Sequence, residues 1–235
     1  MGKIVTIHQP DFMPWLGLFN KISKADELIV LDHVVNNPKS AEFWCRRVKM
    51  LIGGKAHWMS ITLKKDEHNL FIPINIMEFV KDEKAIKKFK ASIEQNYKRA
   101  PYFKDIFYLI ENYFSQSTNN LSLLNVWFIK EVMMRLKIDT NLVFSSELVP
   151  QYSSNEMLID LLKKRNANIY LCGNGAGAYQ KDELYNQQNI EVKYNNFNHP
   201  VYNQFNSTEF TKGLSIIDAL MNLGFEATSN LVKAS

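Results

Sequence analysis

The sequence predicts an α/β fold in which a mostly parallel, Rossmann-like sheet carries flanking helices and a helical insertion or subdomain. Short apolar, β-branched segments alternate with amphipathic segments toward both ends of the chain, and a long helical stretch separates the two halves. We therefore expect three parts: residues 1–82 and 141–235 form the N- and C-terminal parts of the α/β domain, and residues 83–140 form the helical insertion. A chain of 235 residues is long enough to bury a full core.

The beginning of the chain predicts a β-turn-α-β unit. A strand is expected at 3–8, and it ends at Gln9-Pro10 because proline lacks a backbone N–H. A helix is expected at 14–24, where apolar residues recur at helical spacing, and 28–31 has the composition of a buried strand. Such a unit is typical of the start of a parallel sheet.

The remaining elements follow from the same two periodicities. The strand expected at 72–77 contains Pro73, which favours an edge position because proline has no backbone N–H to donate to a neighbouring strand. Three helices are expected within 83–137, and a further helix follows the capping-box pattern Ser153-x-x-Glu156. The other expected strands lie at 58–63, 72–77, 142–145, 168–172 and 190–194.

Charge and cysteine content predict a soluble, cytoplasmic protein. The formal net charge of +4 is spread along the chain, which does not describe a nucleic-acid-binding stripe but suits a small anionic substrate. Cys45 and Cys172 match no metal-ligand spacing, and no signal peptide is recognised. No apolar run reaches the roughly 18 to 20 residues that cross a bilayer, so we expect no membrane insertion. The oligomeric state is left open.

Residues 8–11 (His8-Gln9-Pro10-Asp11) stand where the first strand ends and the first helix is about to begin. This edge of an open α/β sheet commonly binds ligands, because helix amides and strand-end side chains converge there. His8 at this point could bind phosphate, act as an acid or base, or ligate a metal; the alternative is that it only caps the helix.

Two residues of the following helix are candidates for the wall of the same pocket. Trp15 offers a ring for stacking, and Gly17 permits a close backbone approach. The competing interpretation for both is ordinary core packing, which is the commoner role of an aromatic residue at helical spacing.

Asp32 and Arg46 are the candidate charged groups from the next segments. Asp32 follows the second strand and, in a parallel sheet, would lie at the same edge as His8, where it could orient the imidazole, bind a cation or simply be solvated. Arg46, in Cys45-Arg46-Arg47, could hold a phosphate or carboxylate with its planar fork, or belong to a surface charge pair.

A glycine-rich turn follows the strand at 168–172. Gly173-x-Gly175-x-Gly177 could bind an anion through backbone amides, yet it lacks the Lys-Ser/Thr of a P-loop and the spacing of the dinucleotide fingerprint. Cys172 is best interpreted as a buried strand residue. A hydrolase with Cys45 or Cys172 as nucleophile is the least favoured function.

Several of these segments together resemble the WbqC-like family, which is found in bacterial surface-polysaccharide gene clusters. The resemblance is strongest at 7–17 (Ile7-His8-Gln9-Pro10-Asp11-Phe12-Met13-Pro14-Trp15-Leu16-Gly17) and covers nearly the whole chain. The chain departs from the family pattern at Cys45, where asparagine is usual, and at Cys172, where serine is usual. The other matching positions are Lys21-Ile22, Ala25-Asp26, Arg46, Trp58, Asn96-Tyr97, Pro101-Tyr102-Phe103, Tyr170, Gly173, Gly177, Tyr179, Tyr202, Gln204, Leu214-Ser215-Ile216 and Asp218.

The resemblance implies an amide-forming enzyme of O-antigen assembly, either an acyl or aminoacyl transferase or an ATP-dependent amide ligase, acting on a nucleotide-linked amino sugar. His8 would be the base or a phosphate ligand, Asp11 and Asp32 orienting or metal-binding carboxylates, and Arg46 the phosphate ligand. The alternative is a non-catalytic sugar-nucleotide-binding or assembly protein with stacking aromatic residues. The other implied substrate-binding residues are Gln9, Trp15, Gly17, Gly173, Gly177, Tyr179, Tyr202 and Gln204.

The opening segment is also similar to that of nucleotidylyltransferases and pantothenate synthetase, in which paired histidines hold ATP phosphates. This similarity leaves ATP and Mg²⁺ open as cofactors. Here the second histidine is missing, and Pro14-Trp15-x-Gly17 stands in its place. The similarity is therefore an analogy of fold.

Overall fold

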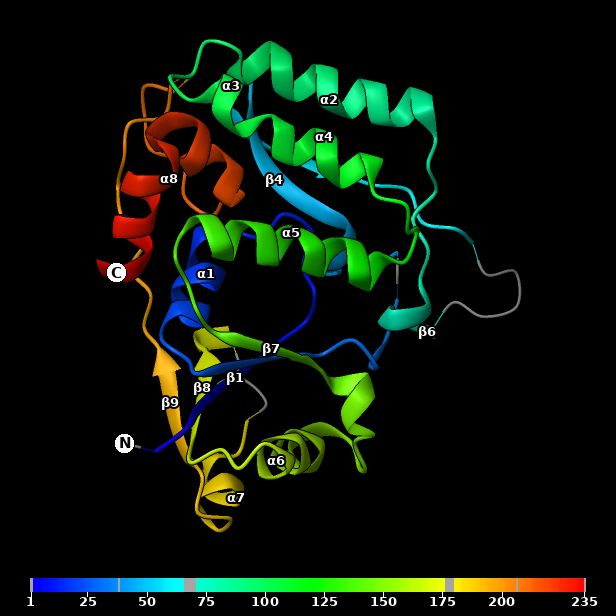
Figure 1. The fold of residues 1–235 in the computed structure, drawn as a ribbon, viewed down its shortest axis with the longest axis vertical. Coiled ribbons are helices and arrows are strands. Elements are labelled where there is room, and N and C mark those ends of the chain that lie inside the picture. The colour runs from blue at the N-terminus through cyan, green and yellow to red at the C-terminus, as the bar shows by residue number, and fades with distance from the viewer. Residues whose placement is uncertain (1, 38, 66–70, 176–179, 206, 235) are drawn as a thin grey trace.

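A computed structural model of the protein contains a five-stranded, all-parallel sheet with the strand order β7-β2-β1-β8-β9 (Figure 1). The structure describes residues 2–37, 39–65, 71–175, 180–205 and 207–234. This sheet confirms the predicted α/β class and the mostly parallel arrangement. The strands are β1 (Ile4–His8), β2 (Glu27–Val30), β7 (Asn141–Phe144), β8 (Ile169–Gly173) and β9 (Glu191–Asn195).

The order of the strands contains a switch point between β1 and β8. The chain first adds β2 and β7 on one side of β1, and then crosses back to add β8 and β9 on the other side. In open α/β sheets, ligands bind beyond the carboxyl ends of the strands at such a switch point. His8 ends β1 and Gly173 ends β8, so both lie at this edge.

Helices cover both faces of the sheet because successive strand residues point to opposite sides. Val5, Ile7 and Ile29 pack in one core with α6 (Ser154–Lys164) and α7 (Asp182–Asn186). Leu28 and Val30 belong to the larger core on the opposite face, together with α1 (Leu16–Ser23) and the C-terminal helix α8 (Ile216–Ala234).

A second layer, made of helices and a β-hairpin, lies over the α1 side of the sheet (Figure 1). The hairpin is β4 (Arg47–Ile52) with β5 (Lys55–Ser60), and the short strands β3 (Val35–Asn36) and β6 (Ile72–Pro73) pair with each other. Three 3₁₀ turns, η1 (Trp44–Arg46), η2 (Ile74–Ile76) and η3 (Ser145–Leu148), complete the described elements. The helices are α2 (Glu83–Tyr97), α3 (Phe103–Ile106), α4 (Tyr108–Ser115) and α5 (Leu121–Arg135).

Several predicted elements differ from the observed ones. The middle helix of the predicted insertion is split at Phe107 into α3 and α4. The strand expected at 58–63 is β5, which begins and ends earlier and belongs to the antiparallel hairpin. The segment expected as a strand at 72–77 pairs over two residues only and then turns through η2.

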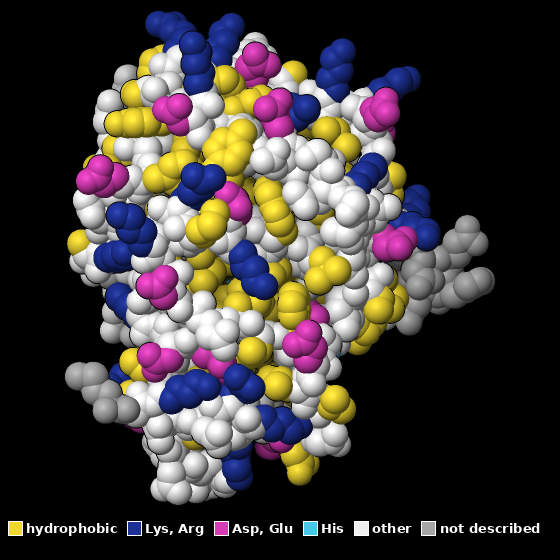
Figure 2. Space-filling view, viewed as in Figure 1, with side chains coloured by type: hydrophobic (Ala, Val, Ile, Leu, Met, Phe, Trp, Pro, Cys, Tyr) yellow, Lys and Arg dark blue, Asp and Glu magenta, His cyan; other side chains and the backbone are white. Residues whose placement is uncertain are grey.

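Figure 2 shows basic and acidic side chains interspersed over one face of the molecule, with no continuous basic stripe among the described residues on that face. No helix within the described ranges is long and apolar enough to cross a membrane. That the chain does not bind nucleic acid stays a prediction.

A buried carboxylate, Asp218 on α8, connects the C-terminal segment to the helical layer. Tyr97 of α2 donates to its Oδ1 at 2.8 Å, while Tyr202 and Gln204 donate to its Oδ2 at 2.7 and 3.0 Å. Burial raises the pKa of Asp218, and these three hydrogen bonds act in the opposite direction. Tyr97 also accepts from the backbone N–H of Leu51 in the hairpin, so one carboxylate ties three parts of the fold together.

Replacing this carboxylate should therefore destabilise the fold strongly. Asp218→Ala leaves three buried donors without their acceptor, and we expect a loss of about 3 to 5 kcal/mol in the free energy of unfolding, measured by urea denaturation. Glu94→Ala, at an exposed position of α2, is the control and should change stability by no more than about 0.5 kcal/mol. A loss below about 1 kcal/mol for Asp218→Ala would contradict the role given to this network.

Candidate functional site

His8 is the middle member of a hydrogen-bonded chain at the carboxyl end of β1. Its Nε2 lies 3.0 Å from Asp11 Oδ2, and its Nδ1 lies 3.3 Å from Lys21 Nζ. Lys21 Nζ also donates to the carbonyl oxygen of Ile7 at 3.2 Å. An amine donates whether it is charged or neutral, so Nδ1 accepts from Lys21 and Nε2 carries the proton that is donated to Asp11.

The surroundings of His8 favour its neutral, singly protonated imidazole. Burial lowers the pKa of His8, and the neighbouring Lys21 lowers it further, while Asp11 acts to raise it. Burial also lowers the pKa of Lys21 to about 8, against the charges of Cys172 and Asp11, which raise it. His8 is therefore a neutral imidazole near pH 7.

His8 and Asp11 both line a cavity, but Asp11 is the one that keeps an oxygen without a strong hydrogen-bond donor among the described residues. Both ring nitrogens of His8 are occupied, so the imidazole holds Asp11 in place and does not offer a free lone pair. Asp11 is only 5% exposed, yet it lines two cavities. Its Oδ1 has the Cys45 thiol at 3.9 Å, a weak donor that leaves this oxygen available to a stronger one.

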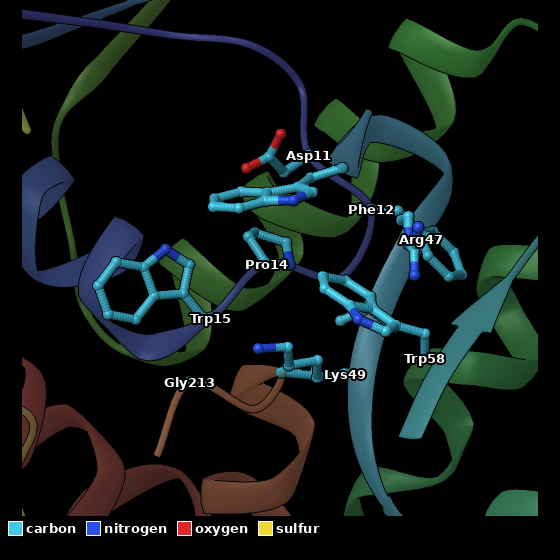
Figure 3. Close-up of a pocket in the computed structure, with 11 residues that line it drawn as sticks. Asp11, Phe12, Pro14, Trp15, Arg47, Lys49, Trp58 and Gly213 are labelled. Carbon is cyan, nitrogen blue, oxygen red and sulfur yellow. The ribbon is translucent and has the colours of Figure 1, made fainter. Parts of the chain in front are cut away.

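The first cavity, which we call the indole cavity, has a volume of about 230 Å³. Figure 3 shows Asp11 at one end of it and Lys49 and Gly213 at the other, with Trp15 and Trp58 on either side of Pro14. Trp44 and Trp58 are 45% and 43% exposed, so their rings are accessible to a ligand. The lining residues are Asp11, Phe12, Pro14, Trp15, Trp44, Arg47, Val48, Lys49, Trp58, Gly213 and Ser215.

Two cations of strand β4 are held at this cavity by the Trp58 indole. The Arg47 guanidinium lies 4.0 Å from the ring centroid and Lys49 Nζ lies 5.1 Å from it. Residues two apart on a strand share a face, and Trp58 is the cross-strand partner of Lys49, so the hairpin brings the three together. Asp11 is the sole acidic side chain among the described residues that line the cavity.

A second cavity, which we call the edge cavity, has a volume of about 220 Å³ and shares Asp11 and Trp44 with the first. It lies over the carboxyl ends of β1 and β2, on the side of the sheet that α6 covers. Its lining residues are Ile7, His8, Gln9, Asp11, Leu31, Glu42, Trp44, Leu158 and Tyr170.

The Trp15 ring packs directly against Gly17. A Cβ added at Gly17 would lie 2.3 Å from the Trp15 ring, so the close approach predicted for this glycine is that of the indole itself. The ring also makes an edge contact with Phe197 at 5.3 Å. Trp15 lines the indole cavity, whereas Gly17 fixes the position of its wall.

Asp32 lies at the predicted strand end, but it binds residues that follow β7. Its Oδ1 accepts from Ser145 Oγ at 3.0 Å and from the Ser146 backbone N–H at 2.9 Å, and its Oδ2 accepts from Ser146 Oγ at 2.8 Å. It lines neither cavity in the described part of the chain. The geometry gives Asp32 a role in holding the ends of β2 and β7 together.

The other predicted site residues fall into separate places. Gln9 lines the edge cavity, and its Oε1 accepts from Asn36 and the Cys45 thiol at 3.4 and 3.8 Å. Gly173 ends β8, and no atom of the part of the chain that the structure describes lies within 4 Å of a Cβ added to it. Tyr202 and Gln204 bind Asp218, as described above. Gly177 and Tyr179 lie outside the described residues.

The adjacent residues Arg46 and Arg47 differ in their position relative to the cavities. Arg46 lines neither cavity in the described ranges, whereas Arg47 lines the indole cavity. The Nε atoms of both are buried without an acceptor among the described residues. Burial and the neighbouring Arg47 lower the pKa of Arg46.

The residues at the end of β1 do not fit the phosphates of ATP. Both ring nitrogens of His8 are engaged, and Asp11 places a carboxylate beside the imidazole, where it would repel a triphosphate. Across the described part of the chain, no three His, Cys, Asp or Glu side chains converge as a metal site requires.

Sequence reasoning missed Lys21, Arg47 and Lys49 as site residues. A basic residue within the apolar face of a predicted helix was a usable signal for Lys21, because burying an amine requires partners. The alternation of Arg47 and Lys49 indicates one strand face only once β4 is known to be a strand. Trp58 joins them through the hairpin register, which local sequence does not specify, and Trp44 lies in the turn η1 that precedes β4.

Adding a methyl group at Gly17 should displace the Trp15 indole. We expect Gly17→Ala to destabilise the fold by about 1 to 3 kcal/mol, although the same change in an open helix position is stabilising. Thermal unfolding and tryptophan fluorescence measure the two effects. The control is Gly175→Ala, because no atom of the described residues lies within 4 Å of its added Cβ. Equal stability of the two variants would contradict the packing argument.

The lowered pKa of Lys21 should make stability depend on pH. Between about pH 8 and the ordinary value of 10.5, the unfolded chain holds a proton that the folded chain has lost. The free energy of unfolding therefore rises with pH across this window, by up to ~1.4 kcal/mol per pH unit, and becomes flat below it.

Denaturant titrations of the wild type and Lys21→Met, at intervals from pH 7 to 10.5, isolate this contribution as a difference between the two proteins. We expect the difference to grow in favour of the wild type as pH rises. Lys88→Met, at an exposed position of α2, controls for the general loss of a lysine. A difference that is constant over the whole range would show that Lys21 is not desolvated.

The amino-acid sequence matches one known protein family. The model of the WbqC-like protein family matches residues 9–230. An uncharacterised protein of Mycobacterium tuberculosis, Rv1507c, is 26% identical over 233 residues, which cover 97% of each chain. No solved structure matches the chain. The family match includes the indole cavity, the Asp218 network and four of the five strands of the sheet, and the chain belongs to the WbqC-like protein family.

Proposed function

We propose that this protein is a transferase that acylates or aminoacylates the amino group of a nucleotide-linked amino sugar, in the assembly of bacterial surface polysaccharide such as O-antigen. The observation that carries the proposal is the composition of the indole cavity. It combines three indole rings, two cations and one buried carboxylate.

Each of these groups suits one part of such a substrate. An exposed indole offers a flat apolar face on which a nucleobase can stack. Arg47 and Lys49 supply positive charge for a diphosphate, and arginine adds paired donors. Asp11 accepts hydrogen bonds from an ammonium or amine, which a hydroxyl-bearing sugar would provide only in weaker form.

The Asp11-His8 pair supports a transfer reaction on that amine. A protonated amine is not a nucleophile, so it must lose a proton before it attacks an acyl carbon. Asp11 is positioned to receive this proton, because it lines the cavity, His8 fixes its Oδ2, and its Oδ1 has only the weak thiol donor of Cys45. The neutral imidazole donates to the carboxylate and keeps it oriented through the reaction.

The alternative is a protein that binds the same nucleotide sugar without converting it. One observation favours it: neither ring nitrogen of His8 is free to exchange a proton with a ligand. The two functions share the binding site and differ in the role of Asp11.

Quenching of tryptophan fluorescence tests the binding part of the proposal. Uridine- and thymidine-diphosphate amino sugars are compared with the same sugars carrying a hydroxyl in place of the amino group, and with ATP. We expect the wild type to prefer the amino form by about tenfold, equivalent to ~1.4 kcal/mol, and Asp11→Asn to lose this preference. Tighter binding of ATP than of any nucleotide sugar would sink the proposal.

Variants of the cationic side chains, together with product analysis, complete the test. Arg47→Ala and Lys49→Ala should weaken both forms of the sugar about tenfold or more, while Arg46→Ala, one residue away, should leave binding unchanged. Mass spectrometry then detects acyl transfer to the amino sugar, which Asp11→Asn should abolish. Tight binding with no product for any activated donor would instead support the binding protein.

A further inference from the structure

The edge cavity is unlike the indole cavity in its charge. Its floor is apolar, formed by Ile7 at the end of β1, Leu31 after β2 and Leu158 of α6. Its charged side chains are two carboxylates, Asp11 and Glu42, and no Lys or Arg lines it in the described part of the chain.

The remaining polar groups do not reverse this charge. His8 is neutral, for the reasons given above, and Gln9 carries no charge. Lys21 bonds to His8, which lines the cavity, but its ammonium donates to His8 Nδ1 and to the Ile7 carbonyl, and Lys21 itself is not among the described lining residues. An anionic ligand placed there would face two carboxylates with no cation in contact with it.

We propose that the edge cavity binds the second substrate of the transfer, an ester or thioester whose acyl group carries a positively charged amino group and a small apolar side chain. This inference rests on the proposed function. The ammonium would pair with Glu42 at the exposed rim, and the apolar side chain would contact Ile7, Leu31 and Leu158.

The size of the cavity limits the acyl group. A volume of about 220 Å³ lies below the roughly 300–1,000 Å³ of sites that enclose drug-sized ligands. It suits a group the size of one amino acid, with the leaving group outside the cavity. A free carboxylic acid, an acyl phosphate or an adenylate would each add negative charge.

The shared residue Asp11 brings the two substrates together. The sugar amine in the indole cavity and the acyl carbonyl in the edge cavity would meet across this carboxylate, which lines both. The ammonium first loses one proton, which passes through Asp11 to solvent. The neutral nitrogen then forms a bond with the acyl carbon, and the ester or thioester bond breaks. The second proton lost by the nitrogen moves to Asp11 and then to the departing oxygen or sulfur, so no other reactant is needed.

The test compares four probes that share one apolar side chain and differ in charge: leucine methyl ester, N-acetyl-leucine methyl ester, leucine and 4-methylpentanoate. Binding to the full-length protein is measured by calorimetry and by the NMR shifts of the His8 ring. We expect the cationic ester to bind at least tenfold more tightly than the anion, with the neutral ester between them. Equal or tighter binding of the anion would overturn the proposal.

Variants at the rim and the floor locate the binding. Glu42→Gln should lose most of the preference for the cation, and Glu42→Lys should reverse it; both changes lie at an exposed position, so the fold should be kept. Glu94→Gln, on α2, is the matched control and should behave as the wild type. An unchanged preference in both Glu42 variants would refute the assignment.

A floor variant separates this inference from the proposed function. Leu158→Trp should fill the edge cavity and abolish binding of the ester, while binding of the nucleotide sugar in the indole cavity stays within a factor of two. If the nucleotide sugar does not bind at all but the ester binds as expected, the proposed function fails and the assignment of the edge cavity stands. Ester binding that survives both Leu158→Trp and the Glu42 variants counts against the assignment.

Discussion

The hydrogen bond between Lys21 and His8 is the interaction on which the whole site depends. It joins α1 to the end of β1, and it forces the imidazole proton onto Nε2, facing Asp11. If Lys21 did not donate to Nδ1, the ring could carry its proton there and leave Asp11 without a donor. A buried amine is costly, and its pKa of about 8 expresses that cost. The fixed orientation of the Asp11 carboxylate is the compensating gain.

The indole cavity depends on a second constraint, the closure of the chain around Trp15. Ser215 donates its backbone N–H to Lys49 at 2.9 Å and its hydroxyl to Met13 at 2.7 Å, which joins the C-terminal segment to both the first loop and the hairpin. Asp218, one turn further along α8, anchors this segment to α2. Three stretches far apart in sequence therefore form one cavity, and Gly17 lets the indole complete it.

The sequence predicted the parts of the fold that local periodicity determines, and it failed where partners come from distant segments. β1, α1 and β2 follow from spacing and proline alone, whereas β4 was missed because its alternating basic residues resemble a solvated surface until Trp58 is seen across from Lys49. His8 was located correctly, but its expected neighbour Asp32 is held by residues that follow β7. Local sequence does not distinguish the surroundings of His8 after β1 from those of Asp32 after β2, because the order of strands in the sheet decides which residues lie beside each.

The low exposure of Asp11 matters in the proposed reaction because water must be kept away from its carboxylate. In the proposed reaction, water competes with the sugar amine for an activated acyl group, and a base that activates the amine would equally activate water. Asp11 is only 5% exposed, and Trp44 borders both cavities, so occupied cavities would leave little room for water beside the carboxylate. Cations in the indole cavity, and none among the described residues of the edge cavity, would direct each substrate to its own cavity. In the proposed reaction, the charge difference and the burial would therefore both favour transfer over hydrolysis.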